Sequence, residues 1–234
     1  MKMNKKKIFV VALAVCMVAI LSFGTLAWFN ASDEVKNTFL VADSDNNNVP
    51  DFDVDVWEND GTTSDPMSSI VYPDILPGDK LTKNVYIQNT GDYDQYIRVY
   101  VTFSDYTKLS AAQAKYNLSA NLTSWLNLGN KWVSGNPVYK VDANADTVTY
   151  CFYLNEILEK KDVATNVEQL FSAVTIPNQF VQEDMTFAGA DFDITVKAEA
   201  VQTENIDITG VNGSCDAEKT FNKINWLAFE EYPA

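Results

Sequence analysis

Histidine is absent from this chain of 234 residues. Its absence excludes the Ser-His-Asp and Cys-His catalytic arrangements and the HExxH zinc site, because each of them uses an imidazole as base or ligand. A zinc hydrolase would need carboxylate or cysteine ligands throughout, which is unusual for catalytic zinc. The 32 acidic residues form no recognisable catalytic motif. The sequence therefore predicts a protein that is not an enzyme.

Basic residues are scarce, since 17 Lys and Arg stand against 32 Asp and Glu and give a net charge of −15. Nucleic acids and anionic membranes select a positive surface, so we expect neither as a partner. Apolar residues are plentiful at 47%, with 13 Phe and 11 Tyr among them. This composition suffices for a packed core, and the acidity is typical of a protein that must stay soluble outside the cell.

Cysteine is also rare, with three in the chain. Cys16 lies in an apolar N-terminal run, which leaves Cys151 and Cys215 as a pair. The alternation of residues 148–154 places Cys151 on the face opposite to the apolar positions of that segment. In an oxidising compartment, a Cys151–Cys215 disulfide and two thiols are both compatible with the sequence.

The N-terminus has the three parts of a secretory leader. Lysines in residues 2–7 precede an apolar run over 8–23, and the small residues Thr25 and Ala27 follow at the spacing that a signal peptidase reads. The alternative is an uncut membrane anchor, although the run is shorter than a bilayer span requires. We therefore interpret 1–27 as a signal peptide, and expect a secreted protein that meets the membrane only during export.

Period-two alternation of apolar residues dominates the rest of the chain and predicts strands with one buried face. The clearest examples are residues 52–56, 81–87, 97–103 and 192–200, and a turn is expected at 89–92. Helical spacing over 110–129, 155–161 and 165–173 predicts three helices in the connections. Residues 42–234 should then form a mainly β, antiparallel β-sandwich with short helical insertions. Its tail is too apolar to stay free and should dock: Phe221, Ile224, Trp226, Leu227 and Phe229.

One polar loop has the spacing of a calcium site. Asp43, Asp45, Asn47 and Asp51 place oxygen donors at loop positions 1, 3, 5 and 9, which is similar to the DxDxDGxPD loops of extracellular calcium repeats. Asn48 replaces the glycine of an EF-hand, and no Glu follows at position 12. The alternatives are a Ca²⁺ site and a solvated acidic loop, and no other cofactor is expected.

Four segments together resemble the camelysin/TasA family of secreted biofilm-matrix fibre proteins. They are WFNASDEVKNTF at 28–39, LPGDKLTK at 76–83, YIQNTG at 86–91 and AEAVQ at 198–202. The resemblance implies a jelly-roll-like sandwich, a leader cut by a dedicated signal peptidase, and a Gram-positive extracellular matrix or cell surface. Within the second segment, Gly78 and Asp79 are expected to shape a loop rather than to carry chemistry.

The resemblance also implies assembly by donor-strand exchange. The mature N-terminal segment 28–41 would add a strand to the incomplete sandwich of the next subunit, with Val35, Phe39 and Val41 entering the acceptor groove. Such a contact grows a head-to-tail homopolymer, and an accessory matrix subunit is a second partner to consider. Three alternatives stay open: the strand completes its own domain, the protein is a camelysin-like secreted metallopeptidase, or it is a monomeric calcium-binding surface module.

Overall fold

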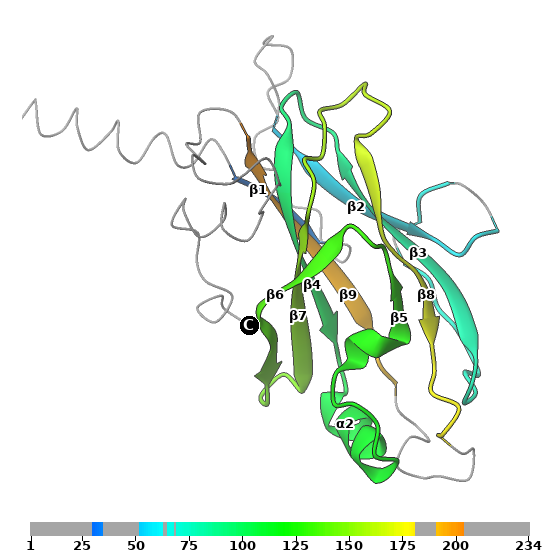
Figure 1. Cartoon of the computed structure of the whole chain (residues 1–234). Coiled ribbons are helices and arrows are strands. Elements are labelled where there is room, and N and C mark those ends of the chain that lie inside the picture. Colours follow the sequence, from blue (N-terminus) through cyan, green and yellow to red (C-terminus); the bar gives the residue numbers. More distant parts are fainter. Residues whose placement is uncertain (1–29, 35–51, 63–64, 68, 181–190, 204–234) are drawn as a thin grey trace, which may run out of the picture.

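The computed structural model describes residues 30–34, 52–62, 65–67, 69–180 and 191–203, with 30–34 and 135–139 described as backbone only. Two antiparallel sheets pack against each other as a β-sandwich (Figure 1). Sheet A has the strand order β1-β9-β4-β7-β6, with bounds Asn30–Glu34, Ile194–Gln202, Gln95–Phe103, Thr147–Leu154 and Trp132–Asp142. Sheet B has the order β2-β3-β8-β5, with bounds Val54–Asn59, Lys80–Asn89, Val167–Thr175 and Leu126–Leu128.

The predicted fold class, a mainly β antiparallel sandwich, is confirmed. The chain crosses between the sheets several times, with β2–β3 in sheet B and β6–β7 in sheet A as consecutive pairs, and the first and last described strands, β1 and β9, are neighbours in sheet A. Strands distant in sequence therefore pair within each sheet, as β4 does with β9 and β3 with β8. The strands predicted from alternation correspond to β2, β3, β4 and β9.

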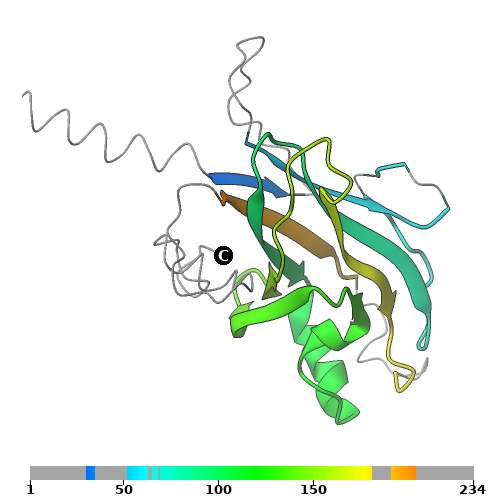
Figure 2. The same cartoon turned by 45° about the horizontal axis from the view of Figure 1, so that its top comes forward.

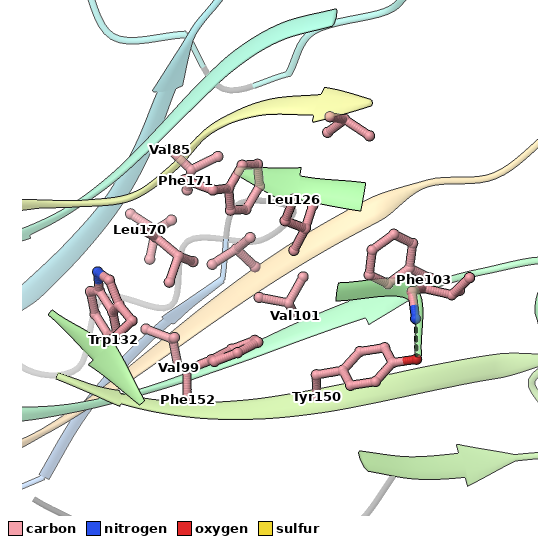
Figure 3. Close-up of a cluster of buried hydrophobic side chains, with 14 of the residues drawn as sticks. Val85, Val99, Val101, Phe103, Leu126, Trp132, Tyr150, Phe152, Leu170 and Phe171 are labelled. Atoms are coloured by element: carbon pink, nitrogen blue, oxygen red, sulfur yellow. Dashed lines mark hydrogen bonds between the residues drawn. The ribbon is translucent and has the colours of Figure 1, made fainter. Parts of the chain in front are cut away.

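The core lies between the two sheets and is built from alternate residues of their facing sides. Figure 3 shows Val99, Val101 and Phe103 of β4 pointing toward Phe171 and Leu170 of β8. The Phe103 ring meets Trp125 and Tyr150 edge to face, with centroids 6.4 and 6.0 Å apart. The buried Tyr150 hydroxyl accepts a hydrogen bond of 2.9 Å from the Leu122 backbone N–H, so its polar atom is satisfied inside the core.

The helix predicted over 165–173 is wrong, because the chain forms strand β8 from Val167 to Thr175. Leu170, Phe171 and Val174 are all in the core, a spacing that resembles one face of a helix. The pairing explains it: Leu126 and Leu128 of β5 lie opposite Val174 and Phe171, so β8 carries an extra residue between them. Such a bulge breaks period-two alternation and imitates a helical period.

The first predicted helix is shorter and earlier than expected. Helix α2 covers Tyr106–Lys115, and the chain then forms the 3₁₀ helix η1, Leu122–Trp125, and β5. The α2 residues Leu109 and Ala112 are buried in the core, at the end of the sandwich seen in Figure 1. The helix predicted over 155–161 is also wrong, because this segment is a connection whose Leu158 bridges to Gln95.

The predicted turns are confirmed. Gly78 has φ of 90°, a conformation that favours glycine, and the Asp79 carboxylate accepts a hydrogen bond of 2.8 Å from the Leu76 N–H. At the second turn, the Asn89 side-chain oxygen accepts a bond of 2.9 Å from Gly91 N–H. Among the described residues, no helix has the length and apolarity that a membrane span requires.

Candidate functional site

The edge of sheet A formed by β1 is the candidate site, because it is where the N-terminal part of the chain joins the sandwich. β1 pairs antiparallel with β9, with Asn30 opposite Val201 and Glu34 opposite Lys197. Figure 2 shows β1 running alongside β9 at the margin of the sheet. β1 also contacts β2, the edge strand of sheet B. It therefore closes the side of the sandwich where the two sheets meet.

Without β1, the nine-residue strand β9 would become the edge of sheet A. Its N–H and C=O groups on that side would lose their partners, and a long unpaired edge readily accepts another strand. The core side of β9 carries Val196, Ala198 and Ala200, and the neighbouring β2 carries Val54 and Val56; all five are buried. The slot beside β9 thus combines backbone pairing with an apolar rim, which is what β-strand addition requires.

The sequence placed the donor strand within residues 28–41, and β1 falls inside that range. The structure pairs it with β9 of the same chain. This arrangement matches the alternative in which the strand completes its own domain, and it also identifies the slot that an exchanged strand would occupy. The three expected donor side chains, Val35, Phe39 and Val41, lie outside the described residues.

A buried ion pair lies next to this slot. Arg98 of β4 donates from Nε and Nη2 to Glu199 Oε2 at 3.1 and 2.7 Å, and the two residues are 1% and 2% exposed. Burial, the largest single influence, would lower the pKa of Arg98, but the Glu199 carboxylate together with Tyr100 and Tyr153 outweighs it, so the pKa is raised. In the β1–β9 register, Glu199 is opposite Ser32. Sequence alternation gave no sign of this pair, because Arg98 resembles an ordinary outward-facing residue of a half-exposed strand.

The predicted calcium ligands Asp43, Asp45, Asn47 and Asp51 all lie outside the described residues. Within the part of the chain that the structure describes, no group of three or more His, Cys, Asp or Glu side chains is placed to hold a metal ion. The calcium site therefore stays a prediction.

Of the predicted cysteine pair, the structure places Cys151 and not Cys215, which lies outside the described residues. Cys151 is on β7 and faces away from the core cluster that contains Tyr150 and Phe152, as the alternation predicted. It is nevertheless only 1% exposed. Burial raises the pKa of the neighbouring Tyr153 hydroxyl, and Cys151 contributes in the same direction.

A hollow of about 400 Å³ lies between α2, η1 and the end of β8. Two of its lining residues, Gln113 and Trp125, carry buried N–H donors, Nε2 and Nε1, that have no hydrogen-bond partner among the described residues. Sequence analysis missed this feature, because Trp125 was assigned to a continuous helix. Buried donors of this kind are commonly satisfied by ordered water, so the hollow does not by itself indicate a ligand.

The LPGDKLTK segment also contributes a buried charge. Lys83 of β3 donates to the Glu58 carboxylate of β2, and both residues are largely buried. A register shift between Thr82 and Val85 interrupts the β3–β8 pairing here, which explains why the lysine breaks the apolar stripe of the strand. This ion pair links β2 to β3 at the edge of sheet B. Like the Gly78 turn, it has a structural role rather than a chemical one.

The chain has no match among protein-family models, curated proteins or solved structures.

Proposed function

We propose that this protein is an exported structural subunit that assembles head to tail into extracellular fibres of a biofilm matrix or cell surface, by exchange of its N-terminal strand. The observation that carries the proposal is the position of β1: it is the first described strand, and it occupies the edge slot beside β9 and against β2. The resemblance of the 28–39 and 76–83 segments to camelysin/TasA proteins supports the same reading.

Exchange would preserve the contacts that β1 makes. The same strand, in the same register with β9, would come from the preceding or following subunit, so the backbone pairing in the fibre would equal that in the single chain. Residues 35–53 join β1 to β2, and at full extension they reach roughly 60 Å. This length is sufficient for β1 to leave its own sheet and enter that of a neighbour.

The geometry of exchange produces a filament rather than a closed dimer when each subunit gives its strand to one neighbour and receives from another. The two surfaces involved, the donated segment and the β9 slot, are different parts of the chain. Such a heterologous contact leaves one free slot and one free strand at the ends, and growth continues from there.

A register-specific cross-link distinguishes exchange from self-completion. Ala31 lies opposite Ala200, and directly opposed residues have Cβ atoms about 5 Å apart, within reach of a disulfide. We expect the double variant Ala31→Cys/Ala200→Cys, made in mature protein with Cys151 and Cys215 changed to Ser, to give a covalent ladder when assembled material is oxidised and run on a denaturing gel. The matched control is Ala31→Cys/Lys197→Cys, whose positions are out of register.

Truncation supplies the second part of the test. A chain that begins at residue 42 should form no fibres in negative-stain micrographs, and a synthetic peptide of residues 28–41 should restore its thermal stability, less effectively when Phe39 is replaced by Asp. If assembled material yields only internally cross-linked single chains, β1 completes its own domain and the exchange mechanism is wrong.

A further inference from the structure

The two outer faces of the sandwich differ in exposure. On sheet B, the side chains that face away from the core are half-buried, for example Trp57, Tyr86 and Gln88. This is normal, since an antiparallel sheet in a sandwich usually has one solvated face. On sheet A, seven outward side chains of β4, β7 and β9 are no more than 4% exposed, whereas the outward residues further along these strands, Thr102, Thr149, Thr195 and Lys197, are half-buried. We call the buried set the outer face of sheet A: Tyr96, Arg98, Tyr100, Cys151, Tyr153, Glu199 and Val201.

No helix or strand within the described ranges lies over this face. Sheet B covers the opposite side, and α2 sits at the end of the sandwich (Figure 1). We infer that the C-terminal segment, residues 204–234, lies across the outer face of sheet A and forms a third layer of the domain. The inference is independent of fibre formation, because it concerns the fold of the single chain.

The path of the chain favours this segment. β9 ends at Gln202 inside sheet A, between β1 and β4, and the Thr203 N–H bonds to the Asp94 carbonyl at 3.0 Å. The chain therefore leaves from the sheet whose face needs a cover. Five strands at about 4.8 Å spacing span roughly 20 Å, and residues 204–234 reach roughly 100 Å when extended.

Composition supports the same occupant. The segment carries large apolar residues that can cover tyrosine rings and the stem of Arg98: Phe221, Ile224, Trp226, Leu227 and Phe229. The stretch 35–51 is a poorer candidate because it is mostly Asp, Asn, Ser and other polar residues. The apolar run at 8–23 is a stronger competitor, and removal of the leader tests it directly.

The chemistry of the face shows why a cover matters. The Arg98–Glu199 pair, the Tyr153 hydroxyl and the Cys151 thiol are all withdrawn from water, and Arg98 also lies over the Tyr100 ring with Cζ 5.3 Å from its centroid. Removing the cover would hydrate these groups together. Cys151 is the most useful reporter among them, because alkylation of a buried thiol requires local opening.

The experiment uses mature protein, residues 28–234, with Cys215→Ser so that Cys151 is the single thiol. The rate of maleimide reaction is measured under dilute, native conditions, alongside circular dichroism. We expect slow reaction in this chain, reaction at least about a hundredfold faster in a chain that ends at Thr203, and at least about tenfold faster in the full-length Trp226→Ser/Phe229→Ser variant. Val71→Ser is the control, because Val71 is 83% exposed, and it should leave the rate unchanged.

Several results would overturn the inference. One is a truncated chain that stays folded and protects Cys151 as well as the full chain does. If truncation prevents folding, an unchanged maleimide rate in the Trp226→Ser/Phe229→Ser variant would also overturn the inference. Rapid reaction in the 28–234 chain, with protection of Cys151 in a 1–234 chain that also carries Cys16→Ser, would assign the cover to the leader. A rate that rises on dilution would assign it to a second copy.

Discussion

The Arg98–Glu199 pair gives the sharpest test of how this sandwich is built. Glu199→Ala removes the carboxylate and leaves the Arg98 guanidinium, 1% exposed, without its counter-charge. Breaking one partner of a buried pair typically costs about 3–5 kcal/mol. For a domain of this size each kcal/mol corresponds to roughly 2–4 °C in melting temperature, so we expect a loss of roughly 6–20 °C.

The assay is equilibrium unfolding in urea. The dependence of the free energy of unfolding on urea concentration is compared between variants, because an equal dependence shows that the same amount of surface is exposed on unfolding. An exposed pair provides the matched control. Lys131 contacts Glu156 at 2.9 Å, and the two side chains are 38% and 55% exposed, so Glu156→Ala should cost no more than about 1 kcal/mol. The double variant Arg98→Met/Glu199→Leu should recover most of the loss, because apolar replacements of buried pairs are often neutral or better.

A loss below about 1 kcal/mol in Glu199→Ala would refute the reasoning, because it would mean that water reaches the guanidinium. The same substitution also bears on the C-terminal cover. In the chain that ends at Thr203, the penalty should fall to that of the exposed control, since Arg98 would then be hydrated. An equal penalty with and without the tail would show that the tail does not enclose the pair.

Two further predictions concern alkaline pH and calcium. Tyrosines of the unfolded chain ionise near the ordinary pKa of 10.0, whereas burial raises the pKa of Tyr153 and raises that of Tyr72 to about 12, so the unfolded state loses protons first. The free energy of unfolding should therefore fall as pH rises above about 10. In denaturant titrations at several pH values, the Tyr153→Phe variant should lose less free energy of unfolding over this pH range. An unchanged pH dependence would contradict burial of that hydroxyl. Millimolar Ca²⁺ should raise the melting temperature if Asp43, Asp45, Asn47 and Asp51 form a site, and Asp43→Ala/Asp45→Ala should abolish the shift; no shift in the unmodified protein would leave the solvated-loop interpretation.

Strands with an undisturbed alternation were predictable from the sequence, and those with bulges were not. In β4, every inward residue from Ile97 to Phe103 is apolar, and the pattern identifies the strand without knowledge of its partners. In β8, Leu170 is an extra residue relative to β3, because Val85 and Tyr86 lie opposite Phe171 and Gln169, so Leu170 and Phe171 both enter the core. A single sequence cannot show a bulge that exists only relative to a neighbouring strand.

The site was predictable in part. The N-terminal segment could be singled out because it resembles a donor strand, but its pairing with β9 joins two ends of the described chain, and no local pattern encodes such a contact. The buried outer face of sheet A was hidden for a related reason. Tyr96, Arg98 and Tyr100 alternate with apolar residues as solvent-facing residues do, and their burial depends on chain that lies elsewhere in the sequence.

These two features meet on β9. One edge of this strand pairs with β1, and its outer face holds Glu199, which binds Arg98 within the sheet. An ion pair in this place has a consequence for strand exchange. When β1 leaves while the outer face stays covered, the sheet edge beside Glu199, which lies opposite Ser32, opens to water. Hydration of the carboxylate from that edge offsets part of the lost pairing, whereas an apolar pair would only gain exposed surface. We therefore expect the ion pair to lower the free energy of the state in which β1 has left the sheet, relative to the state in which β1 is paired with β9. The Arg98→Met/Glu199→Leu variant should then exchange its N-terminal strand more slowly, while its folded state stays as stable as that of the unmodified chain.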